Sequence, residues 1–175
     1  MNEQRQIFLH GPLGRRQFRE VLSTMLASLL INPDEIWLVS PWLSDFPLLD
    51  NRSGQWNSLE PKWGSRTVSF SELLARAVTG GCSLRIATRD VDSSRYFVRG
   101  LENRLGDNPD FHYLISDTLH SKGFLTRSGF LKGSLNYTFS GTQRNDEHVT
   151  LTQDAQVISD AFLEFKNHYR FEVDR

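Results

Sequence analysis

The stretch LHSKGFLTRSGFLKGSLNYTFSGTQRNDEHV, residues 119–149, determines how the whole chain is interpreted. Its first polar pair is His120 and Lys122, and alternate side chains of an extended segment lie on one face. Three more polar positions follow at Ser134, Asn136 and Glu147. An imidazole, an ammonium, a hydroxyl and an amide are suited to holding and attacking a phosphate diester. We call these five residues the motif, and we expect a phosphodiester site there.

Each side chain of the motif has a distinct expected role. His120 would attack phosphorus, because imidazole is nucleophilic near neutral pH and can then be displaced by water. Lys122 would neutralise the non-bridging oxygens, and Ser134 and Asn136 would add hydrogen-bond donors to the same phosphate. Glu147 would accept the second ring N–H of a histidine and fix its tautomer.

Structural roles for two of these residues stay open. Asn136 is suited to capping a helix that begins after Gly133. Glu147 is suited to pairing with Arg144 on the surface.

Three residues outside the motif are candidate substrate contacts, namely Trp42, Arg89 and Arg127. Trp42 follows an apolar run and can either stack on a base or pack at the end of its strand. Arg127, in an expected hairpin turn, is a cation that can contact a substrate phosphate. Arg89 ends another expected strand, and the arginines after it, within 93–105, fit the solvated face of a helix better than a basic strip.

Length and composition predict a single domain over residues 1–175 that is soluble and cytoplasmic. Lys and Arg number 20 and Asp and Glu number 21, so any basic surface must be local. Cys82 is the only cysteine, which excludes an intrachain disulfide and a thiolate metal cluster. The N-terminus lacks the apolar core of a signal peptide, and no run is long enough to span a bilayer. We therefore expect no metal, no cofactor and no membrane partner.

Apolar periodicity predicts alternating helices and strands. Helices are expected at 15–30, 69–79, 93–105 and 154–169, with a short one after Ser134. Strands are expected at 35–40, 83–88, 111–115, 130–132 and 149–151, with one more that holds His120 and Lys122. Residues 1–13 should be an extended lead-in. Residues 41–68 should be a long loop that is a functional lid, a partly disordered insertion, or a surface excursion pinned by Trp56 and Trp63. The pattern gives the α/β class with a mixed sheet.

The pattern His120-x-Lys122, Gly133-Ser134-x-Asn136 and Glu147 resembles the phospholipase D superfamily, in particular its short bacterial members with one motif copy. The resemblance covers about 36–169 and implies a phospholipase D-like mixed β-sheet with helices on both faces. It also implies a symmetric homodimer whose two motifs meet without a metal ion. One His120 would form a phosphohistidine, and the other would protonate the leaving oxygen.

The chain departs from the family pattern in two respects. Its pattern continues with an Asp five residues after the Lys, where this chain has Arg127, and the interval from His120 to Gly133 is about one residue short. Loss of a supporting residue can cost 10–100-fold in activity.

The resemblance therefore predicts a metal-independent phosphodiesterase, a nuclease that acts on DNA or RNA. The alternative is a catalytically weak or inactive nucleic-acid-binding subunit of a bacterial defence or DNA-modification complex that contains partner proteins. Ser40-Pro41-Trp42 and the long loop resemble the phospholipase D-like protein of deazaguanine DNA-modification gene clusters.

Overall fold

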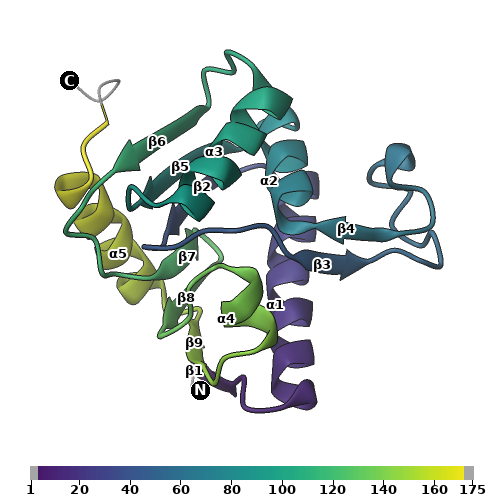
Figure 1. The fold of residues 1–175 in the computed structure, drawn as a ribbon, viewed down its shortest axis with the longest axis horizontal. Helices are drawn as coiled ribbons and strands as arrows, with labels where there is room; N and C mark the ends of the chain where they lie inside the picture. The colour runs from purple at the N-terminus through teal and green to yellow at the C-terminus, as the bar shows by residue number, and fades with distance from the viewer. Residues whose placement is uncertain (1–3, 172–175) are drawn as a thin grey trace.

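A computed structural model describes residues 4–171, and its centre is a mixed sheet of seven strands in the order β1-β9-β8-β7-β2-β5-β6 (Figure 1). The strands are β1 (Gln4–Phe8), β2 (Glu35–Val39), β5 (Ser83–Thr88), β6 (Phe111–Ile115), β7 (Gly123–Thr126), β8 (Gly129–Gly133) and β9 (His148–Thr152). Strands β2, β5 and β6 are parallel, and every other neighbouring pair is antiparallel. The mixed sheet expected from the sequence is therefore confirmed. Part of the expected lead-in, residues 1–3, lies outside the described residues.

Helices cover both faces of the sheet, as expected (Figure 1). They are α1 (Pro12–Ile31), α2 (Phe70–Thr79), α3 (Asp92–Leu105), α4 (Phe139–Gln143) and α5 (Ala155–His168). Apolar side chains of α1, α2 and α3 form the core of one face, and those of α5 form the smaller core of the other. No helix within residues 4–171 combines the length and the apolar character needed to cross a bilayer.

The apolar run of β2 explains its central place. Ile36 and Leu38 point into the core under α1 to α3, whereas Trp37 and Val39 point into the core under α5. All four side chains are buried, so a continuous apolar run was the correct signal for a strand covered on both faces.

The expected helix caps are present. Ser69 and Glu72 form a reciprocal capping box at the start of α2. The Asp154 carboxylate accepts a hydrogen bond of 2.9 Å from the Val157 N–H at the start of α5.

Residues 41–68, expected as a loop without regular structure, contain a projecting two-stranded arm (Figure 1). Its antiparallel strands are β3 (Pro47–Asp50) and β4 (Thr67–Ser69), and the 3₁₀ turn η1 (Pro61–Trp63) lies between them. We call residues 47–69 the arm. A register shift between Pro47 and Leu49 allows two consecutive leucines of β3 to be buried, which removes the alternation by which a strand is recognised.

Side chains of the arm pack against the main core. Trp63 is buried, and Trp56 is partly buried against the same core cluster. Both tryptophans therefore pin the segment to the core, as expected for a surface excursion.

Candidate active site

The motif lies at one end of the sheet, where β2, β5 and β8 finish and where β7 and β9 begin. Val39 is paired with Gly123, and Gly133 is paired with Val149. Continuing these registers by one residue brings Lys122 beside Ser40 and Ser134 beside His148. We call this region the motif end of the sheet.

His120 and Lys122 precede β7, so the expectation that a strand holds them is wrong. Strand β2 stops at Val39, and Pro41 has no N–H with which to continue the ladder. The two residues instead form part of a short extended connection to Gly123. There the Lys122 ammonium donates a hydrogen bond of 3.0 Å to the main-chain oxygen of His120.

Three side chains of the motif, those of His120, Lys122 and Asn136, have no side-chain partner within residues 4–171. The exposed His120 imidazole makes no hydrogen bond within residues 4–171, and in that range Lys122 forms no ion pair. The Asn136 amide oxygen is buried and also has no hydrogen-bond partner in the described chain. A buried polar atom without a partner costs about 1–3 kcal/mol, so its presence needs a reason beyond folding.

Ser134 and Glu147 are bonded to each other. The Ser134 hydroxyl donates to the Glu147 carboxylate and accepts a hydrogen bond of 3.0 Å from the His148 N–H. Glu147 therefore does not pair with Arg144, whose guanidinium lies 5.3 Å from the ring centre of Phe139. Within residues 4–171 the Glu147 carboxylate accepts no hydrogen bond from a histidine ring, so its expected role in fixing a tautomer stays a prediction.

Gly133 makes the contact between Ser134 and Glu147 possible. Its φ is +155°, a conformation that is essentially restricted to glycine. A Cβ atom at this position would lie 2.1 Å from the main-chain oxygen of His148. Glycine thus lets the end of β8 approach the start of β9 closely enough for the two polar side chains to meet.

Asn136 does not cap a helix, so that structural alternative is wrong. Helix α4 begins at Phe139, and its cap is Thr138, whose hydroxyl accepts a hydrogen bond of 2.9 Å from the Gly141 N–H. Asn136 instead lies in the connection between β8 and α4. The next residue, Tyr137, anchors that connection, because its ring is buried and its N–H donates to the Ser40 hydroxyl at 3.1 Å.

Trp42 and Arg89 also lie at the motif end, whereas Arg127 does not. The Arg89 guanidinium carbon is 5.6 Å from the ring centre of Trp42. Arg127 lies beyond the opposite end of β7, with its side chain 3.3 Å from Asp34 and 3.6 Å from Glu35. The structure therefore brings two of the three candidate substrate contacts to the motif.

Glu35 is the centre of a separate charge cluster at that opposite end. Burial opposes ionisation of this carboxylate, but hydrogen bonds from Trp37 and Lys166 outweigh burial and lower its pKa. Lys166 and Arg85 lie 3.2 Å and 2.9 Å from its oxygens. This cluster joins α5 to the sheet, so Arg127 contributes to packing.

Residues to which the sequence assigned no role at the site hold it together. The buried hydroxyl of Ser40 bonds to both Trp42 and Tyr137, and Ser94 and Thr88 fix the turn after β2. The only sequence signal for Ser40 and Thr88 is their position where strands end, at the edge where open α/β sheets bind ligands. No three His, Cys, Asp or Glu side chains in the described part of the chain are placed to hold a metal ion.

Comparison with known proteins finds similarity of structure alone. No family model matches the chain, and no curated protein matches it. NucT from Helicobacter pylori has a TM-score of 0.58 and 14% identity, with 94% of this chain and 95% of that chain covered. The phospholipase D family member Nuc from Salmonella typhimurium has a TM-score of 0.59 and 12% identity, with coverage of 94% and 91%.

A third similar structure is TrmBL2, an archaeal chromatin protein described with a novel mode of DNA binding. It has a TM-score of 0.55 and 11% identity, and 94% of this chain and 52% of that chain are covered. The chain thus has the fold of the phospholipase D superfamily, as the motif indicated. At these identities the fold is defined, and activity must be argued from the site itself. The narrower resemblance to deazaguanine gene-cluster proteins stays a prediction.

Proposed function

We propose that the protein is a metal-independent phosphodiesterase that cleaves DNA or RNA through a phosphohistidine at His120. The observation that carries this proposal is the exposed, unpartnered imidazole at the motif end of a phospholipase D fold. Lys122, which forms no ion pair within residues 4–171, and the side-chain NH2 of Asn136, which donates no hydrogen bond in that range, support a phosphate site beside it.

In the first step, a ring nitrogen of His120 forms a bond to phosphorus with its lone pair, and the P–O bond to the leaving oxygen breaks. The leaving oxygen keeps that bonding pair and takes a proton from His120 of the partner subunit. In the second step, water attacks phosphorus, its proton passes to the partner's His120, and the P–N bond breaks. Lys122 and Asn136 stabilise the charge on the non-bridging oxygens in both steps.

A homodimer is part of the proposal, because the chain has one His-x-Lys pair and the two steps need two imidazoles. His120, Ser121 and Ser134 are exposed on a single chain, which leaves this surface free for a second copy. A two-fold axis through the motif end would place the two motifs opposite each other.

A second candidate function is nucleic-acid binding with weak or no cleavage, within a defence or DNA-modification complex. Two observations favour it. Glu147 is bonded to Ser134 and not to a histidine, and the position of the expected Asp is occupied by Arg127, which pairs with acidic residues away from the motif. TrmBL2 illustrates that a similar fold occurs in a chromatin protein.

The test is cleavage of end-labelled DNA and RNA in EDTA by the wild-type protein, by His120→Ala and by the control His168→Ala. His168 is exposed on α5, so its removal should leave cleavage unchanged. The proposal expects activity that His120→Ala abolishes, together with acid-labile labelling of the wild-type protein by phosphate. The dimer is tested separately by the solution mass.

The outcomes separate the two functions. Full cleavage by His120→Ala would overturn the phosphodiesterase proposal. Salt-sensitive binding without cleavage or labelling would favour the second function. A monomer at the concentrations that support cleavage would contradict the shared site.

A further inference from the structure

An exposed aromatic side chain stands at the motif end. Trp42 is 41% exposed, although the strand that precedes it is buried. Its neighbour Leu43 is fully buried, so the chain continues into the core on either side of the indole.

Buried hydroxyl groups fix the turn that carries Trp42. The Ser40 hydroxyl donates to the Trp42 main-chain oxygen at 2.7 Å, and the Ser94 hydroxyl accepts from the Leu43 N–H at 3.1 Å. Thr88 donates to Ser94 at 2.8 Å. All three hydroxyl residues are buried, with Ser40, Thr88 and Ser94 at 0% exposure. A buried polar network that is satisfied in this way makes its backbone rigid, so the indole is presented in one place.

Hydrogen bonds link the surroundings of Trp42 to the segment before His120 and to the segment that holds Asn136. Ser40 accepts a hydrogen bond from the N–H of Tyr137, the residue after Asn136. Arg89, beside the indole, donates from Nε to the main-chain oxygen of Asp117 at 3.0 Å, three residues before His120. Arg89 forms no ion pair with any carboxylate between residues 4 and 171, so its charge is available to an anion.

We propose that Trp42 and Arg89 form a stacking platform for the base of the nucleotide next to the bound phosphate. This inference rests on the proposed function and specifies its substrate as single-stranded nucleic acid. A base can stack on indole only when it has left its own duplex stack, and such stacking accepts every base. Arg89 holds the indole from one side and adds attraction for the neighbouring phosphate.

The platform does not suit a quaternary ammonium headgroup. Such a cation is recognised by an aromatic face that is free of other cations, and here Arg89 already lies 5.6 Å from the ring centre. The arrangement therefore favours an anionic ligand with a flat ring.

The test measures binding in EDTA and at fixed salt, in a His120→Ala background so that cleavage does not interfere. The probes are a labelled 12-nucleotide single strand, the same strand as a duplex, an abasic strand of equal length, and phosphatidylcholine vesicles. Both DNA and RNA strands are used. The variants are Trp42→Ala, Trp42→Phe and, as a control, Tyr96→Ala, which removes an aromatic side chain that is 82% exposed on α3.

Trp42→Ala should weaken binding to the single strand by about tenfold to a hundredfold, and Trp42→Phe by only a few-fold. Neither variant should change duplex binding or the dependence on salt, and Tyr96→Ala should change nothing. The abasic strand should bind the Trp42 protein as weakly as the normal strand binds Trp42→Ala.

Equal binding of the normal and abasic strands would overturn the platform, as would an equal loss for strand and duplex. A loss of vesicle binding alone would overturn it in favour of a lipid site. Because Trp42→Phe keeps a ring, it separates stacking from a folding defect. The result is also independent of the proposed chemistry, since it compares the binding of intact probes and requires no phosphohistidine.

Discussion

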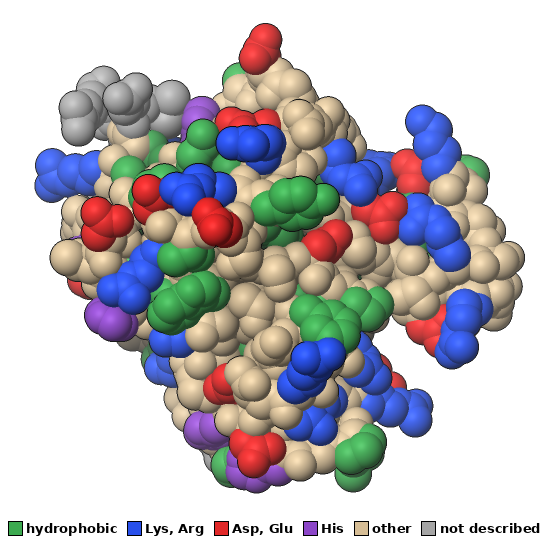
Figure 2. Space-filling model, in the orientation of Figure 1, with side chains coloured by type: hydrophobic (Ala, Val, Ile, Leu, Met, Phe, Trp, Pro, Cys, Tyr) green, Lys and Arg blue, Asp and Glu red, His purple; other side chains and the backbone are tan. Residues whose placement is uncertain are grey.

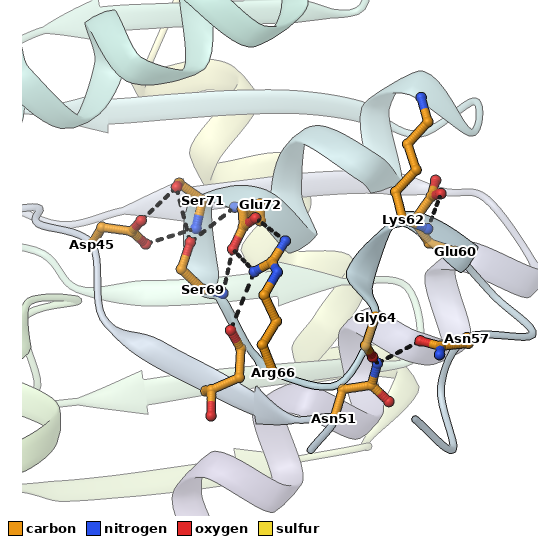
Figure 3. A network of polar contacts seen from close by, with 11 residues as sticks. Asp45, Asn51, Asn57, Glu60, Lys62, Gly64, Arg66, Ser69, Ser71 and Glu72 are labelled. Carbon is orange, nitrogen blue, oxygen red and sulfur yellow. Dashed lines mark hydrogen bonds and ion pairs between the residues drawn. The ribbon is translucent and has the colours of Figure 1, made fainter. Parts of the chain in front are cut away.

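The arm and the motif end differ in whether their polar side chains have hydrogen-bond or charged partners. In the arm, the Asn51 amide is fully buried and donates hydrogen bonds of 2.7 Å to the Asn57 side chain and to the Gly64 main-chain oxygen (Figure 3). Its oxygen accepts a hydrogen bond of 2.8 Å from the Trp56 N–H. Arg66 binds both carboxylate oxygens of Glu72, which also completes the cap of α2 (Figure 3). These groups are satisfied by their own chain.

At the motif end three groups of the motif are open. The Asn136 amide oxygen is buried without a partner, the His120 imidazole is free, and Lys122 has no acidic partner in the described chain. Figure 2 shows that Lys and Arg side chains are interspersed with Asp and Glu on the visible face, so no large patch of one charge covers that face. The comparison teaches that the satisfied groups of the arm build its structure, whereas the open groups of the motif end are available to a ligand.

Asn51→Ala should give the largest effect on stability. It removes three buried hydrogen bonds and leaves their partners unsatisfied, so the free energy of unfolding should fall by about 2–4 kcal/mol. Urea titration measures this change. Asn57→Ala removes one of these bonds and is the control, for which a smaller loss is expected. A loss of less than about 1 kcal/mol for Asn51→Ala would contradict the difference between the arm and the motif end.

Asn136→Ala should weaken binding without destabilising the fold. No hydrogen bond is lost from the described chain and the cost of the buried oxygen is removed, so the free energy of unfolding should not fall by more than about 0.5 kcal/mol. Affinity for an oligonucleotide phosphate should fall by about 1.5–3 kcal/mol, because a donor to a charged group is removed. Parallel urea and anisotropy titrations measure the two quantities. Unfolding that is as costly as in Asn51→Ala would place Asn136 among structural residues.

Glu72→Gln tests the arm through pH. Hydrogen bonds from Arg66 lower the pKa of Glu72 against the opposing effect of burial, and the Ser69 N–H adds to the lowering. Because the folded pKa is the lower one, this carboxylate stabilises the fold above its unfolded pKa of about 4.3 and loses that contribution as pH falls through the folded value.

At pH 7 the substitution should cost about 0.5–1 kcal/mol. Between pH 5 and pH 3 the urea midpoint of the variant should fall less than that of the wild-type protein. An equal fall in both proteins would show that the contact between Arg66 and Glu72 contributes nothing to acid stability.

Arg127→Ala should give the smallest effect. The side chain is 62% exposed and its ion pairs are 3.3 and 3.6 Å long, so about 0.5 kcal/mol or less is at stake. Cleavage and oligonucleotide binding should stay within about twofold of wild type, because the residue lies away from the motif. Arg16→Ala, which removes another exposed paired arginine, is the control. A tenfold loss of binding specific to Arg127→Ala would restore it as a substrate contact.

Much of the fold could be predicted from local chemistry. The apolar run of β2 and the capping box of Ser69 and Glu72 depend on neighbouring residues alone, and both are present. The arm could not be predicted, because a register shift buries Leu48 and Leu49 together and hides the period of two. The structure of that segment depends on the tertiary contact of Trp63 with the core, which the sequence does not show.

The site was only partly predictable, for a related reason. Spacing identified the motif, but it could not show that β7 starts after Lys122, since that depends on where β2 ends. It also could not show that Arg127 faces Asp34 from the far end of the strand. Registers between distant strands determine both facts, and one sequence does not contain them in local form.

The backbone conformation at Gly133 limits which substitutions this surface can accept. Any other side chain there would meet the His148 carbonyl and push apart the two segments that hold Ser134 and Glu147. A saturation library selected for function should therefore return glycine alone at this codon, while Lys132 beside it, which is exposed, should tolerate many replacements. Because there is no room for a Cβ atom at position 133, we expect this position to accept no residue other than glycine.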